Sequence, residues 1–398
     1  MIITRSKALE KEVELERLIA KISGSQNGPT LVFFAGIHGN ETAGIYALTH
    51  ALKNFSKTDL KGTIYAIAGN LNALSKNKRY IEQDLNRMWT QEELDTLISK
   101  EKLNSEEKEQ LEIYKLLQDI KDTHSGPIYF IDFHTTSSKT LPFITINDAL
   151  INRKFSQLFP VPVVLGIEEF LKGPLLSYIN QLGYVSLGFE SGQHDELDAV
   201  LNCESFIYLS LVYTQAMDKE KLLDFDMHYN QLRKQSDIIS DIFEVSYLYR
   251  IKPDENFKMK PGFKSFQIIS KGTLLAESNS QAVLSAYNAR IFMPLYQKQG
   301  SDGFFIIKSI PPIFLKISEL LRKYNLDNLL VFLPGISWFN KDQGILSVNL
   351  KVTRFLAKQI FHLFGFRSQQ LDKSKILLYN RERVSKFDLY KREAWFKK

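Results

Sequence analysis

The stretch Phe33–Gly44 limits what this chain can fold into more than any other, because it joins an apolar segment to a polar, glycine-containing loop. Leu31–Ala35 is typical of a buried strand, and Ala43–Lys53 is typical of the helix that follows it. The loop carries His38 and Glu41, whose side chains can reach one ion only where the backbone bends sharply. Two glycines beside the histidine permit that bend. The pair is weak evidence alone, so a metal site needs a third ligand from elsewhere.

Two further polar side chains stand at the ends of apolar segments. His134 lies at the end of the predicted strand Ile128–Thr136, and Glu190 follows the predicted strand Tyr184–Phe189. Ligands bind outside the carboxyl ends of strands in open α/β sheets. A second histidine there completes two imidazoles and a carboxylate, the usual protein ligand count of a catalytic zinc. A further carboxylate can serve as general base. His194 is a competing ligand, although His134 has the better strand-end position.

Alternating apolar strands and helices predict an α/β fold with helices on the faces of a sheet. We expect a surface helix over Lys7–Ser23 and a structural helical segment over Gln91–Lys121. Short alternating runs between Pro, Gly and Asn turns then indicate a small antiparallel β-domain within Ile238–Lys308. The helices Pro312–Tyr324 and Leu350–Phe364 are predicted near the carboxyl end. The predicted domains are residues 1–224 (α/β), 225–310 (β-rich) and 311–398 (a basic helical extension).

Composition narrows the class of protein. The 398 residues include one cysteine, Cys203, which excludes an internal disulfide framework and a cysteine-based zinc site. No apolar run approaches the roughly 18–20 residues of a membrane span, and the N-terminus lacks the apolar core of a signal peptide. We therefore expect a cytoplasmic protein. Residues 351–398 carry 13 Lys and Arg against 4 Asp and Glu, so the net charge of +6 belongs to this segment.

The loop Lys78–Arg87 is too polar for a core strand and too irregular for a helix face. It contains two arginines that could grip an anionic substrate through paired hydrogen bonds. A solvated loop with surface ion pairs is the alternative interpretation of the same residues.

Four segments together resemble the succinylglutamate desuccinylase/aspartoacylase family, a branch of the zinc carboxypeptidase-like hydrolases. They are Gly-Ile-His-Gly-Asn-Glu (36–41), Arg-Tyr-Ile-Glu-Gln-Asp-Leu-Asn-Arg (79–87), Asp-Phe-His-Thr-Thr (132–136) and Glu190. The resemblance covers roughly residues 25–308 and implies a zinc carboxypeptidase-like mixed sheet flanked by helices. Residues 311–398 depart from the better-known members, so their role stays open.

The resemblance also implies a role for each matching position. The zinc ligands would be His38, Glu41 and His134, and Asp84 would be the partner of the first histidine. Glu190 would be the general base, and Arg79 would stabilise the oxyanion. The substrate carboxylate would bind to Asn86 and Arg87, and Tyr296 would be a substrate-binding tyrosine from the second domain.

The expected function is zinc-dependent hydrolysis of the amide bond of an N-acyl amino acid, of N-acetyl or N-succinyl type, with one Zn²⁺ per chain and Glu190 assisting attack by zinc-bound water. Two alternatives stay open: a zinc carboxypeptidase acting on peptides, and a zinc-retaining binding protein that uses its basic C-terminal segment. A small-molecule substrate is expected, with no nucleic acid and no membrane span. The sequence is compatible with a homo-oligomer.

Overall fold

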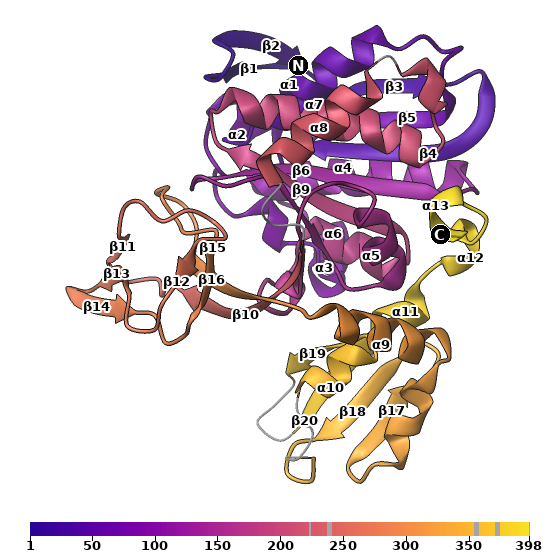
Figure 1. Ribbon diagram of the computed structural model, residues 1–398. Coiled ribbons are helices and arrows are strands. Elements are labelled where there is room, and N and C mark those ends of the chain that lie inside the picture. Colours follow the sequence, from indigo (N-terminus) through magenta and orange to yellow (C-terminus); the bar gives the residue numbers. More distant parts are fainter. Residues whose placement is uncertain (223, 237–240, 354–357, 371–374, 398) are drawn as a thin grey trace.

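A computed structural model describes residues 1–222, 224–236, 241–353, 358–370 and 375–397 (Figure 1). Within these ranges, eleven strands form one mixed sheet in the order β12-β15-β16-β10-β8-β7-β9-β6-β4-β5-β3. The strands of this sheet are β3 (Leu18–Ser23), β4 (Gln26–Ala35), β5 (Lys61–Ala68), β6 (Ile128–Thr136), β7 (Phe143–Ile146), β8 (Val163–Leu165), β9 (Val185–Gln193), β10 (Ile242–Arg250), β12 (Ile268–Ile269), β15 (Ala289–Phe292) and β16 (Asp302–Ser309). This mixed α/β architecture is the predicted fold class.

The centre of the sheet is parallel. β5, β4, β6 and β9 pair in one direction, while β7 runs antiparallel to β9. Every residue of β6 is buried, as expected for a parallel strand covered on both faces. Parallel pairing also aligns the carboxyl ends of these strands at one edge, which is where the polar residues of the sequence motifs lie.

Alternate side chains of the central strands enter two different cores. In β4, Phe33 joins the core that contains α1 and α7, whereas Phe34 joins the core that contains α3, α4 and α6. The helices are α1 (Ala43–Ala51), α2 (Leu71–Ser75), α3 (Gln91–Ser99), α4 (Ser105–Thr123), α5 (Leu150–Ser156), α6 (Leu175–Gln181), α7 (Leu197–Tyr213) and α8 (Phe225–Ser236), with 3-10 turns η1 (Leu52–Asn54), η2 (Leu85–Arg87), η3 (Ile167–Glu169) and η4 (Lys219–Lys221). In the described ranges, no helix combines the length and apolar character needed to cross a membrane.

The predicted helix over Lys7–Ser23 is wrong, because this segment forms strands. β1 (Ile2–Ser6) and β2 (Lys11–Leu15) make a two-stranded antiparallel sheet, and β3 pairs with β5 and forms the edge of the main sheet. Over so few positions, the spacing of the apolar residues among the charges fits both the helix period and the strand period. The available partner strand decided the outcome, since short segments take their structure from tertiary pairing.

The predicted β-rich segment forms strands, but it does not form a separate sheet throughout. β10 pairs in parallel with β8 and antiparallel with β16, so the main sheet continues through it. A second sheet of three strands projects from this side (Figure 1, orange): β11 (Phe257–Met259), β13 (Leu274–Ser278) and β14 (Gln281–Leu284). The domain boundaries at 224 and 310 stay predictions.

The C-terminal region contains the predicted helix α9 (Pro312–Lys323), but a purely helical extension is wrong. Four strands form an antiparallel sheet in the order β17-β18-β20-β19. After α9, this region contains η5 (Leu326–Phe332), β17 (Ile336–Asn340), β18 (Ile345–Asn349), α10 (Lys358–Leu363), β19 (Phe366–Gln370) and β20 (Lys375–Asn380). Residues 354–357 of the predicted helix Leu350–Phe364 lie outside the described residues. Alternate residues of these strands, such as Leu346 and Val348 in β18, pack into one core.

The last residues return to the main domain as three short helices, α11 (Arg381–Val384), α12 (Phe387–Tyr390) and α13 (Ala394–Lys397). Tyr390 accepts a hydrogen bond from the Val185 backbone N–H at 3.1 Å, and Trp395 Nε1 donates to Tyr129 Oη at 3.0 Å. Both rings are buried against the main core. The chain end is therefore anchored beside β6 and β9 (Figure 1).

Candidate active site

His38, Glu41 and His134 come together at the carboxyl edge of the sheet. His38 and Glu41 lie in the loop between β4 and α1, and His134 lies near the end of β6. The loop can hold this shape because Gly36 has a φ of +71°, which glycine adopts without strain. Gly39 is also required, since a Cβ there would stand 2.1 Å from the carbonyl carbon of Ala73.

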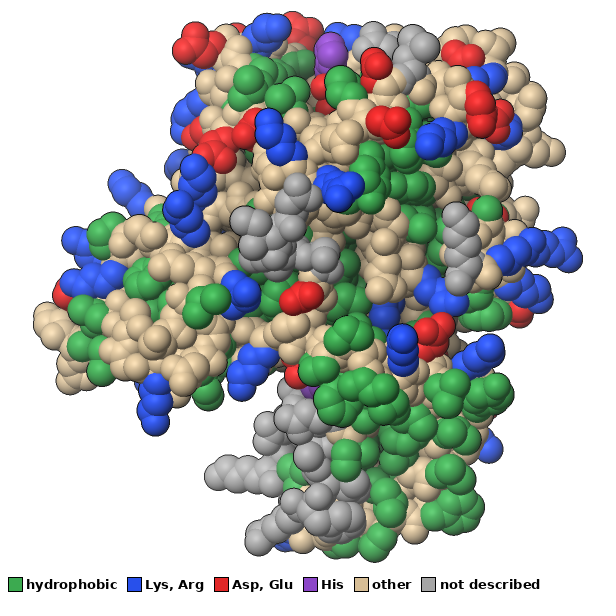
Figure 2. All heavy atoms as spheres, in the orientation of Figure 1, with side chains coloured by type: hydrophobic (Ala, Val, Ile, Leu, Met, Phe, Trp, Pro, Cys, Tyr) green, Lys and Arg blue, Asp and Glu red, His purple; other side chains and the backbone are tan. Residues whose placement is uncertain are grey.

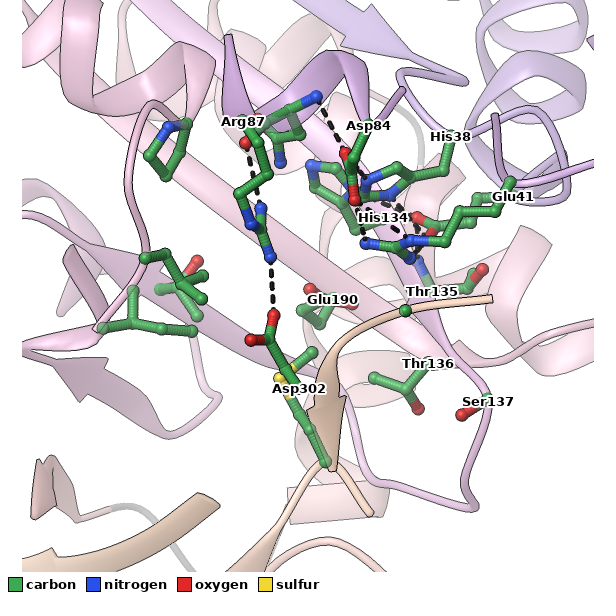
Figure 3. Close-up of a pocket in the computed structure, with 18 of the residues that line it drawn as sticks. His38, Glu41, Asp84, Arg87, His134, Thr135, Thr136, Ser137, Glu190 and Asp302 are labelled. Carbon is green, nitrogen blue, oxygen red and sulfur yellow. Dashed lines mark hydrogen bonds and ion pairs between the residues drawn. The ribbon is translucent and has the colours of Figure 1, made fainter. Parts of the chain in front are cut away.

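The two imidazoles face the same carboxylate. His38 Nδ1 lies 2.8 Å from Glu41 Oε1, and His134 Nδ1 lies 2.9 Å from Glu41 Oε2. One potential ligand atom from each residue lies within 4.8 Å of the others, and all three residues are buried. These atoms are close enough to surround one cation (Figure 3).

The far nitrogen of each imidazole is held by a carboxylate. His38 Nε2 lies 3.0 Å from Asp84 Oδ1, and His134 Nε2 lies 2.8 Å from Asp132 Oδ2. Such a carboxylate fixes the ring orientation and raises the basicity of the nitrogen that faces a metal. Asp84 was expected in this position from the sequence. Asp132 was missed, although a spacing of two residues on a strand places it on the same face as His134.

Electrostatics keep the group charged. Burial would raise the pKa of Glu41, but His38 and His134 hold this pKa well below its usual value. Burial would likewise raise the pKa of Asp84, yet Arg79 and His38 hold it well below its usual value. For His134, Asp132 and Glu41 outweigh burial and hold the pKa well above its usual value. The carboxylate of Glu41 and two imidazoles form a donor set that suits zinc once the ion displaces the proton of His134.

Arg79 reaches over the carboxylates of this group. Its Nε and Nη2 lie 3.2 and 3.1 Å from Asp84 Oδ2, and its Nη1 lies 3.4 Å from Glu41 Oε1. The guanidinium is thus fixed beside the candidate metal site. A positive charge in this place can stabilise negative charge that develops on a reacting oxygen.

Glu190 lies beside His134 because β9 pairs with β6 in a register that sets the two residues opposite each other. Burial raises the pKa of Glu190 to about 7. Its Oε2 is buried and has no hydrogen-bond partner within the described part of the chain. A carboxyl group in this state can exchange a proton near neutral pH.

A pocket of about 290 Å³ opens over these residues. Besides the candidate catalytic residues, it is lined by loop and strand residues from β7, η3, α6 and β16: Thr145, Ile146, Asn147, Ile167, Leu171, Leu176, Ser177, Ser301, Asp302 and Phe305. The chain reaches the pocket from segments far apart in sequence, so its outline could not be read from the motifs.

Asn86 and Arg87 line the pocket but are already engaged. Asn86 Oδ1 accepts a hydrogen bond from the Leu175 backbone N–H at 2.9 Å. Arg87 Nη2 donates to Asp302 Oδ2 at 2.8 Å, and Figure 3 shows this pair among the residues that line the pocket. Asp302 is a further residue that sequence reasoning missed, and no local signal marks it.

Two predicted candidates lie outside the core of the site. Tyr296 is not among the pocket-lining residues. Its hydroxyl donates to Lys260 O at 2.7 Å and accepts from the Phe263 N–H at 3.0 Å, so the structure lends its predicted role no support. The Nδ1 atom of His194 lies 2.6 Å from Thr135 Oγ1, so His194 does not join the group around Glu41. Cys203 is buried, and burial raises the pKa of its thiol to about 12, which disfavours the nucleophilic thiolate.

The mixed sheet and the buried His–Glu–His group at its carboxyl edge define an α/β protein with a metal-type site. Residues 27–199 match the family described as the succinylglutamate desuccinylase/aspartoacylase catalytic domain. Through these residues the chain is similar to the succinylglutamate desuccinylase/aspartoacylase family, as the sequence motifs predicted.

Individual relatives cover only part of the chain. The chain is 32% identical to succinylglutamate desuccinylase of Photorhabdus laumondii over 122 residues. This matched segment is 30% of this chain and 37% of that protein. It is 45% identical to the succinylglutamate desuccinylase of Pseudomonas fluorescens over 65 residues. This segment is 16% of this chain and 19% of that protein. The chain thus spans well under half the length of these curated relatives.

Solved structures share the fold. The succinylglutamate desuccinylase/aspartoacylase of Rhodobacter sphaeroides superposes with a TM-score of 0.55 at 14% identity, covering 73% of this chain and 88% of that chain. The product-bound ectoine utilization protein EutE (DoeB) of Ruegeria pomeroyi superposes with a TM-score of 0.54 at 16% identity, covering 72% and 87%. At these identities the likeness concerns the fold alone.

Proposed function

We propose that this chain is a zinc-dependent deacylase that hydrolyses the amide bond of an N-acyl amino acid, of N-acetyl or N-succinyl type. The observation that carries the proposal is the position of Glu190, which lies buried beside His134 in the pocket that contains His38 and Glu41. A carboxylate with a raised pKa next to a candidate metal site is the arrangement that water activation requires.

His38, Glu41 and His134 would hold the zinc ion, with Asp84 and Asp132 orienting the two imidazoles. When bound, zinc supplies a Lewis acid that polarises a carbonyl and makes a water molecule more acidic. The fit rests on the donor set, because a catalytic zinc commonly takes three such ligands and keeps one open position.

Glu190 moves the proton in the proposed reaction. Its carboxylate accepts a proton from the attacking water as the water oxygen adds to the amide carbon. The same carboxyl group then donates this proton to the amide nitrogen, and the C–N bond breaks. The products are a carboxylic acid and an amine, so the atoms of one water molecule are accounted for.

Arg79 and Arg87 serve different parts of the substrate in this proposal. Arg79, fixed by Asp84, stabilises the negative charge that grows on the carbonyl oxygen, which is a transition-state interaction. Asn86 and Arg87 bind the carboxylate of the amino acid. Neutral amides without a carboxylate should therefore be poor substrates.

The test is a hydrolysis screen of N-acetyl amino acids, N-succinyl amino acids and short peptides, with and without a zinc chelator. Glu190→Gln should retain zinc yet lose roughly 10²–10⁴-fold in turnover, the usual contribution of a general base. Asp198→Asn, at an exposed acidic residue that opens α7, is the matched control and should behave as wild type.

Three results would overturn the proposal. Near wild-type turnover by Glu190→Gln would remove this residue from the mechanism. Preference for peptides over N-acyl amino acids would support a zinc carboxypeptidase. Zinc retention without hydrolysis of any substrate in the screen would favour a zinc-retaining binding protein.

A further inference from the structure

Helix α9 turns its apolar face away from the protein. Its two buried residues are polar: Ser318, whose Oγ donates to Leu363 O at 2.9 Å, and Arg322, whose guanidinium binds Asp148. The exposed large side chains of α9 are Ile313 (58%), Phe314 (48%), Ile317 (39%) and Leu320 (58%). A surface helix normally does the reverse. The polar contacts of Ser318 and Arg322 fix the orientation of α9. Its apolar side therefore faces outward.

The apolar surface continues onto the neighbouring elements. η5 packs against both α9 and β17. Together with the four residues of α9, three more exposed side chains form what we term the α9 face: Tyr324 (63%), Leu329 (56%) and Phe332 (82%). Figure 2 shows hydrophobic side chains gathered over this part of the C-terminal region, whereas charged side chains are interspersed over the main domain.

The α9 face is large enough for a stable protein contact. Its seven side chains expose on the order of 800 Å² at these fractions, against about 800 Å² per partner in a standard interface. Soluble monomers rarely expose contiguous apolar patches beyond a few hundred Å². Three of the seven residues are aromatic, the class that is enriched in the centres of interfaces.

Two observations favour a second copy of the chain as the occupant. β17 is an edge strand of its sheet, and such an edge can pair with its own copy across a two-fold axis. The exposed apolar area also matches what one partner of a stable dimer buries.

We propose that the α9 face is the contact between two copies of this chain. The contact lies in the C-terminal region, outside the matched catalytic segment 27–199, and it does not depend on the proposed reaction. The two active sites would remain accessible, since the pocket is lined by residues of the main domain and of β16.

The experiment is measurement of the solution mass of the full chain by sedimentation equilibrium over a wide range of concentration. The wild type should have twice the chain mass, and Leu320→Glu combined with Phe332→Glu should have the mass of one chain. A second pair, Ile313→Glu with Leu329→Glu, tests the same surface in case the first pair fails to fold. Leu284→Glu, at an equally exposed leucine (54%) on β14, is the control and should remain dimeric.

Three results would overturn the proposal. A wild-type chain that is monomeric at every concentration excludes the contact. Folded α9-face variants that stay dimeric place the contact elsewhere. Binding of a monomeric wild type to phosphatidylserine vesicles, lost in the variants but not in Leu284→Glu, would assign the face to a membrane surface instead.

Discussion

Arg322 binds both carboxylate oxygens of Asp148, a residue 174 positions earlier in the chain, with Nη1–Oδ1 and Nη2–Oδ2 distances of 3.3 and 2.8 Å. Both side chains are almost completely buried. Arg367 in β19 and Arg153 in α5 bind the same carboxylate at 2.8 and 2.6 Å. Asp148 follows Asn147, which lines the pocket. The C-terminal region is therefore tied to the pocket wall through one buried carboxylate.

Arg322→Met should destabilise the chain by about 3–5 kcal/mol, because removal of one partner leaves buried charge uncompensated. The value should lie toward the lower end, since two other arginines still bind Asp148. Urea unfolding measures the change. Lys323→Met, at the exposed neighbour on α9, should cost no more than about 0.5 kcal/mol. Equal losses in the two variants would show that the pair adds no stability.

Asp148 should also make stability depend on acid pH. Burial would raise its pKa, but Arg153, Arg322 and Arg367 hold this pKa well below its usual value. A group with a lowered pKa in the folded state contributes its full stability above its unfolded pKa, about 3.9, and loses it as the pH falls through the folded pKa. The unfolding free energy of wild type should therefore fall more steeply below about pH 4 than that of Asp148→Asn. Parallel curves would contradict this assignment.

Asp132→Asn should weaken zinc binding by about 10–100-fold, because Asp132 holds the far nitrogen of His134 and sets its orientation. Competition with a chelator of known affinity measures the change without reference to activity. Asp122→Asn, at an exposed position near the end of α4, is the control. Unaltered affinity in Asp132→Asn would mean that His134 is not oriented by this contact.

Arg87 and Asp302 should act in opposite directions on substrates that carry a carboxylate. Arg87→Ala should raise KM for N-acyl amino acids by about 10–100-fold, the value of a charge-assisted hydrogen bond, with little effect on neutral amides. Asp302→Asn should lower KM for the same substrates, because the Arg87 guanidinium then has no competing anion at 2.8 Å. Steady-state kinetics on matched charged and neutral amides checks both. A uniform loss of rate would rule out the anchoring role.

Much of the fold was accessible from local patterns. The buried runs that became β4, β6 and β9 were recognisable because strands covered on both faces are almost wholly apolar. Short segments were less secure. Residues 7–23 and the C-terminal strands have mixed polarity, and their structure depends on which partner strand lies alongside.

The sequence by itself determined that His38, Glu41, His134 and Glu190 stand at or after the ends of buried strands. Parallel pairing aligns such ends at one edge of a sheet, so their convergence follows from local positions. Only the tertiary structure decided that Arg87 binds Asp302 and that Arg322 binds Asp148. These pairs join residues 215 and 174 positions apart, and no spacing in the chain specifies which buried charges will meet.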